Sequence, residues 1–173
     1  AAEYLNESSI EEIEYTIKTY GEERNYKKIA KSIYEEIQKN KMYTTFDLKN
    51  AVLKCTSHKY VTKTLARVFQ AIRIKVNDEL NILKDTLENS IKWVHAGGRI
   101  AVISFHSLED RIVKEFFSRK SQNCICPKNI PICICNTSPS LKLLKRKVIK
   151  PTEKEIMANS RSRSAKLRVA EKV

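Results

Sequence analysis

Apolar residues in the first half of the chain recur at every third or fourth position, which is the period of an amphipathic α-helix. This spacing predicts helices throughout residues 1–95. The last run is the longest and predicts one continuous helix that ends at Gly97 and Gly98, because glycine tolerates the left-handed turn after many helices. The apolar faces consist of Ile10, Ile13, Ile17 and Tyr20; Ile29, Ile33 and Ile37; Leu48, Val52 and Cys55; and Phe69, Ile72, Val76, Leu80, Leu83, Leu87, Ile91 and Val94.

Polar residues mark where several helices begin. In a capping box, a Ser or Thr hydroxyl and an acidic side chain three positions later each accept the other residue's backbone N–H. We interpret four such pairs as helix starts. They are Ser9 with Glu12 (or Ser8 with Glu11 in a competing register), Thr44 with Asp47, Ser107 with Asp110, and Thr152 with Glu155.

The pattern changes at Arg99, after which the β-branched run Ile100–Phe105 lies between a Gly-Gly turn and another helical stretch. Such a run is typical of a strand buried on both faces of a parallel α/β sheet. Residues 141–149 and 165–169 are further strand candidates. The predicted fold class is therefore α/β. Because a sheet usually has about 4–6 strands, we expect further strands upstream of Ala1.

Composition narrows the class of protein. Apolar residues make up 42% of the 173 residues, which is enough for a packed core. The sequence shows neither an apolar run of about 18 residues nor the pattern of a signal peptide. We therefore predict a cytoplasmic protein without a membrane span.

The distribution of charge favours a polyanionic partner. The formal net charge is +13, and residues 142–173 hold 11 basic and 3 acidic side chains. Clustered Lys and Arg are typical of nucleic-acid binding, because they neutralise phosphates and release counterions. A basic surface without a partner is the alternative interpretation.

Four of the five cysteines form two Cys-x-Cys pairs, Cys124 with Cys126 and Cys133 with Cys135, and Cys55 stands apart on an apolar helical face. Disulfides are not expected in a cytoplasmic protein, whereas four thiolates can hold a tetrahedral Zn²⁺. The one-residue spacers are tighter than usual, so four half-buried thiols in an apolar loop are the alternative. A thiol redox role has less support, because no Cys-x-x-Cys pair opens a helix.

The segment after the predicted strand carries the clearest candidate site. In open α/β sheets, ligands bind beyond the carboxyl ends of the strands. Ser104 and His106 lie at that end, where the next helix begins with its positive pole. We predict that both residues line a pocket, and that His106 is a candidate proton acceptor. Alternatively, Ser107 and Asp110 only cap the helix and His106 is a turn residue.

Several segments of the chain resemble the MraW/RsmH family of methyltransferases. Residues 97–114, which include Ser104-Phe105-His106-Ser107-Leu108-Glu109-Asp110-Arg111, are similar to the family's signature. Residues 20–24, 69–80 and 159–171 resemble further family motifs in the same order. Ser160 departs from the Pro that is more often found there. The resemblance covers essentially all 173 residues.

The resemblance implies an S-adenosylmethionine-dependent enzyme that methylates the exocyclic N4 of a cytidine in bacterial 16S ribosomal RNA. It implies a helical insert domain for substrate recognition at residues 1–77. Residues 78–173 would be the C-terminal part of a Rossmann-like class I methyltransferase domain. The family's donor-binding residues lie upstream of a stretch like Ala1–Asn6, so we expect no donor site here and an inactive chain on its own.

The expected partner is 16S ribosomal RNA or the small ribosomal subunit, contacted by basic residues. The arginines near residue 160 have an alternative role, the binding of carboxylates within the domain, and Arg73 has an alternative role in linking the two domains. A rival function is a catalytically inert RNA- or ribosome-binding module with a structural zinc. The predicted RNA-binding residues are Arg73, Lys145, Arg146, Lys147, Arg161, Arg163, Lys166 and Arg168.

Overall fold

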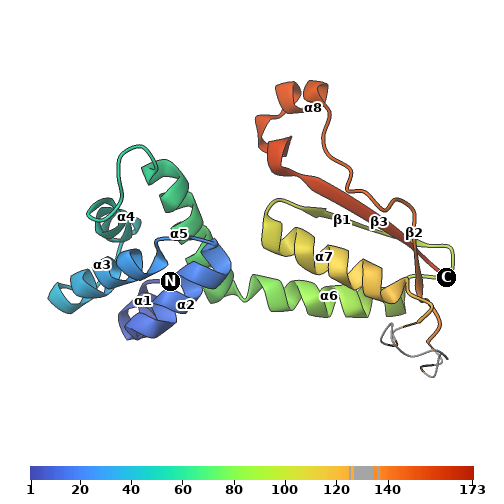
Figure 1. The fold of residues 1–173 in the computed structure, drawn as a ribbon, viewed down its shortest axis with the longest axis horizontal. Helices are drawn as coiled ribbons and strands as arrows, with labels where there is room; N and C mark the ends of the chain where they lie inside the picture. The colour runs from blue at the N-terminus through green and yellow to red at the C-terminus, as the bar shows by residue number, and fades with distance from the viewer. Residues whose placement is uncertain (125, 127–134, 136) are drawn as a thin grey trace. The chain divides into compact units, whose positions relative to one another are not determined.

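The computed structural model of the chain describes residues 1–124, 126, 135 and 137–173. These residues form two compact units, Ala1–Glu79 and Leu80–Val173 (Figure 1). The domain boundary predicted after residue 77 falls next to this division. The roles predicted for the two parts stay predictions.

The first unit is helical and has its own core. Helix α2 packs against both α3 and α5, and α4 packs against α3 and α5. The inward residues are those of the predicted apolar faces, and Ile13, Ile17, Ile29 and Ile33 are at most 1% exposed. The helices are α1 (Ala2–Glu7), α2 (Ile10–Gly21), α3 (Tyr26–Lys39), α4 (Thr45–Leu53) and α5 (Val61–Asn77).

Two of the predicted helix starts are confirmed in this unit. The backbone N–H of Ser9 donates to the Glu12 carboxylate at 2.8 Å, and the Ser9 side chain accepts from Glu12 in return. Thr44 and Asp47 form the same reciprocal box at the start of α4. The competing register with Ser8 is wrong, because the Ser8 hydroxyl donates to the carbonyl of Tyr4 at the end of α1.

The predicted continuous helix from Phe69 to Val94 is wrong. Asp78 has the left-handed backbone conformation, with φ 50°, and divides the run into α5 and α6 (Glu79–Trp93). Aspartate visits this conformation more readily than most residues. Apolar positions continue at helical spacing on both sides of Asp78, so periodicity alone does not reveal the break.

The second unit is a three-stranded sheet with helices on one face (Figure 1). The strands are β1 (Arg99–Ser104), β2 (Leu141–Leu143) and β3 (Lys166–Lys172). Their order is β1-β3-β2, and β3 is antiparallel to both neighbours. Helices α6 and α7 (Ser107–Lys120) supply the rest of the core. Its buried residues are Leu87, Ile100, Val113, Phe116, Phe117, Leu141 and Ala170.

The prediction that residues 100–105 form a strand buried on both faces of a parallel sheet is wrong for the described chain. The partner of β1 is the antiparallel β3. Ile100 and Ser104 are 7% and 3% exposed, whereas Ile103, on the other face, is 60% exposed. The apolar run does not encode the direction of its partner strand. That direction depends on a segment far along the chain, since Ser104 of β1 contacts Lys166 of β3, 62 residues later.

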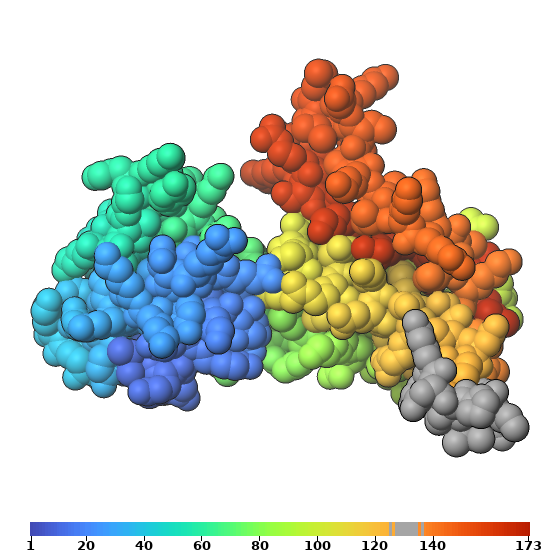
Figure 2. Space-filling model, viewed as in Figure 1, coloured from blue at the N-terminus to red at the C-terminus, as the bar shows by residue number. Residues whose placement is uncertain are grey.

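The two later strand candidates are confirmed, although the first is shorter than predicted. Only Leu141–Leu143 forms β2, and Ile149 adds an isolated bridge to Leu167. Between β2 and β3, helix α8 (Glu153–Ala158) and the 3₁₀ helix η1 (Ser160–Ser164) project away from the sheet (Figures 1 and 2). Thr152 caps α8 as predicted, accepting from the backbone of Glu155. Among the described helices, none has the length and apolarity needed to cross a membrane.

Candidate functional site

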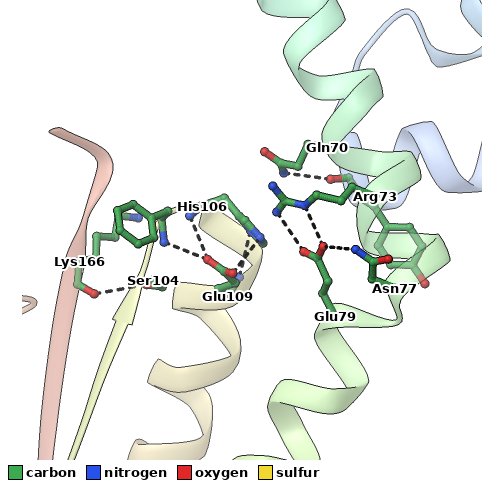
Figure 3. A network of polar contacts seen from close by, with 10 residues as sticks. Gln70, Arg73, Asn77, Glu79, Ser104, His106, Glu109 and Lys166 are labelled. Atoms are coloured by element: carbon green, nitrogen blue, oxygen red, sulfur yellow. Dashed lines mark hydrogen bonds and ion pairs between the residues drawn. The ribbon is translucent and has the colours of Figure 1, made fainter. Parts of the chain in front are cut away.

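The candidate site lies where β1 ends and α7 begins, and its first component is His106. The His106 Nδ1 atom accepts from the backbone N–H of Glu109 at 3.4 Å, and the Glu109 carboxylate accepts from the backbone N–H of Phe105 and His106 (Figure 3). His106 is thus the N-cap residue of α7. The predicted capping box of Ser107 with Asp110 is wrong by one residue at each position.

The same glutamate lies close to both nitrogen atoms of the His106 ring. Its Nε2 atom lies 3.2 Å from Oε1 of Glu109, and the side chain is 11% exposed. Because Nδ1 accepts a hydrogen bond, the neutral ring carries its proton on Nε2. This geometry favours a role in positioning over the role of proton acceptor. The prediction that His106 lines a pocket stays a prediction.

Ser104 is also held by contacts within the unit. It is 3% exposed, and its hydroxyl donates to the carbonyl of Lys166, its cross-strand neighbour, at 3.4 Å (Figure 3). The side chain therefore lies at the end of the β1–β3 ladder. Its predicted place in a pocket is likewise untested.

Asp110, on α7, forms ion pairs with two basic side chains of β3. Its carboxylate accepts from Nε of Arg168 at 2.7 Å, from Nη2 of Arg168 at 3.2 Å and from Nζ of Lys166 at 3.3 Å. The hydrogen bond from Arg168 is the main cause that lowers the pKa of the Asp110 carboxyl, and Lys166 lowers it further. Two of the eight predicted RNA-binding residues therefore tie β3 to α7.

Arg73, in the first unit, is engaged in a similar way. Its guanidinium donates to both oxygens of the Glu79 carboxylate, at 2.8 Å and 3.0 Å, and Asn77 donates to one of them at 3.2 Å (Figure 3). Such a two-point contact fixes the orientation of the arginine. The structure thus shows Arg73 and Asn77 converging on one carboxylate at the turn after α5.

The remaining predicted RNA-binding residues form two exposed groups on the second unit. Arg161 and Arg163 extend from η1, where the buried Ser162 anchors the turn by donating to the carbonyl of Asn159 at 2.8 Å. Lys145, Arg146 and Lys147 follow β2. Within the described residues, these five side chains form no ion pair with an acidic side chain.

Two further basic residues lie beside those that follow β2, around a hollow of about 400 Å³. Lys114 and Arg168 line it together with Lys145 and Arg146. The rest of the lining is mixed, with Ser118, Ser121 and Gln122 beside the apolar Phe117, Leu143 and Val169. Lysine, arginine and hydroxyl side chains are the groups that bind phosphate oxygens in nucleic acids. Residues far apart in the sequence thus form a surface suited to a phosphate.

The candidate metal ligands lie in the segment between α7 and β2. The sulfur atoms of Cys124, Cys126 and Cys135 all lie within 4.8 Å of one another. Cys133, the fourth predicted ligand, lies outside the described residues. Cys55 packs half-buried against the core of the first unit, as predicted, but it lies in the turn after α4 and not on the helical face itself.

Sequence reasoning missed three carboxylates, those of Glu79, Glu109 and Asp110. The role of Asp110 depends on β3, whose cationic partners are 56 and 58 residues away. The pairing of Glu109 with His106 had a local signal, because the acidic residue stands three positions after the residue that caps the helix. Histidine is not among the residues usually expected at that position.

Comparison with known proteins identifies the class. The model of the MraW methylase family matches residues 1–173, and the chain belongs to that family. Proteins named "Ribosomal RNA small subunit methyltransferase H" are similar over nearly the whole chain. Those from Caldicellulosiruptor saccharolyticus, Halothermothrix orenii and Finegoldia magna are 50%, 44% and 41% identical and cover 100%, 99% and 100% of this chain. The chain covers 57% of each of these relatives.

Proposed function

We propose that this chain is the RNA-facing part of a methyltransferase that transfers a methyl group from S-adenosylmethionine to N4 of a cytidine in 16S ribosomal RNA. The observation that carries the proposal is the family match along all 173 residues, together with relatives named for the methylation of small-subunit ribosomal RNA. The proposed partner is 16S RNA or the small ribosomal subunit, and the proposed location is the cytoplasm.

In this proposal the first unit is a substrate-recognition insert. The second unit supplies the last strands of a Rossmann-like class I methyltransferase domain. Two features of the second unit support this assignment: β1 and β2 run in the same direction with the antiparallel β3 between them, and helices cover one face of the sheet.

The residues of this chain do not fit a site for the methyl donor. Donor sites of Rossmann-like domains use a glycine-rich turn from a strand into a helix, and the chain has glycine only at positions 21, 97 and 98. The turn from β1 into α7 holds Phe105 and His106, whose backbone N–H groups donate to Glu109. We place the donor site in the part of the longer relatives that this chain does not cover.

The proposed work of this chain is to bind and orient the RNA. Methyl transfer requires the amino nitrogen to lie in line with the methyl group, and alignment of this kind accounts for much of the acceleration in two-substrate reactions. A base must also leave its stack before an enzyme reaches it. Ser104 and His106 are the proposed pocket residues, and each makes a hydrogen bond to a neighbour within the second unit.

Two measurements on the same preparations test the function. S-adenosylmethionine is titrated calorimetrically into the 173-residue chain and into the protein expressed at the full length of its gene. We expect binding only to the longer protein. The longer protein, incubated with small subunits and labelled donor, is expected to place the label on N4 of cytidine in 16S RNA, as identified by nucleoside mass spectrometry.

The other outcomes are equally informative. If neither protein binds the donor and no label reaches the RNA, the chain belongs to an inert RNA- or ribosome-binding module. Donor binding by the 173-residue chain alone would show that the donor site lies within it, contrary to the proposal.

A further inference from the structure

The segment that joins α7 to β2 is closed at its base by backbone hydrogen bonds. The N–H of Ser140, just before β2, donates to the carbonyl of Lys120 at the end of α7 at 2.9 Å. The N–H of Val173 donates to the carbonyl of Ser140 at 3.1 Å. The two ends of a 19-residue segment, residues 121–139, are therefore fixed side by side. Cys124 and Cys126 follow the first end, and Cys135 precedes the second.

The sulfur atoms have the spacing that a shared metal ion requires. Sγ of Cys124 and Sγ of Cys135 are 3.8 Å apart. A tetrahedral zinc site with Zn–S bonds of about 2.3 Å separates its sulfur atoms by about 3.8 Å. A disulfide requires an S–S distance of about 2.05 Å, so the observed separation suits two ligands of one ion.

A backbone contact supports the same interpretation. The N–H of Cys126 donates to Sγ of Cys124 at 3.4 Å. Hydrogen bonds of this kind orient metal ligands and stabilise the thiolate form that binds the ion. The Cys-x-Cys spacing thus places the second residue's N–H against the first residue's sulfur.

We propose that Cys124, Cys126 and Cys135 hold a structural Zn²⁺ ion in the second unit. Thiolate ligands favour zinc over the hard cations Mg²⁺ and Ca²⁺, which require oxygen ligands. Zinc sites made mainly of thiolates are typical structural sites.

The zinc ion connects the two ends of the segment and so acts on the elements that flank it. Cys124 follows α7 and Cys135 precedes β2, and Lys145 and Arg146 extend from the residues after β2 into the basic hollow. A crosslink between the ends of a loop removes chain entropy from the unfolded state. Zinc therefore stabilises the edge of the sheet that carries these basic side chains.

The test measures metal content directly and does not depend on the proposed methyl transfer. The protein is expressed at the full length of its gene, purified under reducing conditions, and analysed for metal by inductively coupled plasma mass spectrometry. We expect one zinc per chain in the wild type and in the control variant Cys55→Ser, which changes a cysteine of the first unit. In Cys124→Ser and Cys135→Ser we expect the affinity for zinc to fall by about 100-fold or more, because loss of a ligand exceeds the 10–100-fold cost of losing an outer hydrogen-bond partner.

Cobalt substitution identifies the ligands. Replacing zinc with Co²⁺ is expected to give thiolate-to-metal charge-transfer absorption and the intense visible bands of a tetrahedral site. Cys126→Ser is expected to weaken the charge-transfer band. Wild-type protein without stoichiometric zinc, or Co²⁺ bound without charge-transfer absorption, would overturn the proposal. So would a disulfide between cluster cysteines in freshly prepared protein, detected by mass after alkylation.

Discussion

At the scale of single residues, the second unit depends on a carboxylate that joins a helix to a strand. Asp110 on α7 binds Arg168 and Lys166 on β3, and the side chains of Asp110 and Arg168 are both 14% exposed. Removing one partner of such a contact leaves the other charge half-buried without compensation. The contact therefore contributes to stability even where RNA binding is not involved.

We predict that Asp110→Asn lowers the free energy of unfolding of the second unit by about 2 kcal/mol, the range of hydrogen bonds to charged groups. Urea unfolding followed by circular dichroism measures this loss in the free energy of unfolding. The matched control is Glu88→Gln, which also loses two cationic partners, Arg119 and Lys120. Glu88 is 43% exposed and screened by water, so we expect a smaller loss. Equal losses would contradict the assignment.

The same carboxylate predicts the direction of the pH dependence. Arg168 lowers the pKa of Asp110 below its ordinary value of 3.8. The stabilisation is therefore fully present above that value and is lost as the pH falls through the lower pKa of the folded state. Below about pH 4, thermal unfolding of the wild type should shift to lower temperature more steeply than that of Asp110→Asn. Parallel curves for the two proteins would refute this account.

His106 gives a second prediction, because its side chain caps α7. His106→Ala should cost about 1 kcal/mol of stability, as the loss of an N-cap usually does, whereas His106→Asn should restore most of it. Urea unfolding of both variants measures the difference. If Asn fails to rescue stability, the capping contact with Glu109 is not what the histidine contributes.

At the scale of elements, the turn between α6 and β1 contains a glycine whose backbone conformation disfavours other residues. Gly97 has φ +79°, and a Cβ atom there would meet nothing within 4 Å. Its N–H donates to the carbonyl of Lys172 at 2.8 Å, so the turn also holds the end of β3. A substitution at Gly97 thus tests backbone conformation without a steric clash.

We predict that Gly97→Ala destabilises the second unit by about 1–2 kcal/mol, the cost of the left-handed conformation for a residue with a Cβ atom. Gly97→Asn should cost less, because Asn visits this region more readily. Guanidinium unfolding of the two variants, compared with the wild type, checks the order. An Ala variant as stable as the wild type would mean that the turn relaxes to another conformation.

The sequence predicts an element well where its determinants are local. The faces of α2, α3 and α4 and the caps at Ser9, Thr44 and Thr152 depend on residues within one or two turns. The break at Asp78 and the antiparallel partner of β1 depend on contacts that spacing does not encode. The packing at Gly21 is also non-local, because the carbonyl oxygen of Arg67 on α5 lies 3.0 Å from a Cβ atom placed at Gly21.

The candidate site also has a part that the sequence predicts and a part that it does not. The basic residues and the cysteines are recognisable in the sequence, because they are clustered along the chain. Clustering does not separate Arg168 and Lys166, which bind Asp110, from Arg161 and Arg163, which bind no described carboxylate. That distinction requires the register of β3 against β1 and the position of α7, both of which are non-local.

At the scale of the whole molecule, the net charge of +13 is the property that relates structure to the proposed function. The 20 acidic side chains offset 20 of the 33 Lys and Arg charges, some of them in ion pairs such as Arg99 with Glu171 and Arg119 with Glu88. The basic side chains on η1 and after β2 are exposed and available to phosphates. Salt dependence of RNA binding therefore measures which arginines contact the polyanion.

We predict that replacing both Arg161 and Arg163 by Ala weakens binding of 16S RNA and lowers the slope of log K against log salt concentration by about 1.5, since each phosphate contact contributes about 0.7–0.9. Filter binding over a salt series, with the protein at the full length of its gene, measures the slope. The control replaces Arg99 and Arg119, an equal charge loss on arginines that already bind carboxylates. Its slope should change less. Equal changes in the two variants would mean that the net charge, and not the position of η1, governs binding. An unchanged slope in the Arg161 and Arg163 variant would show that these residues lie outside the RNA interface.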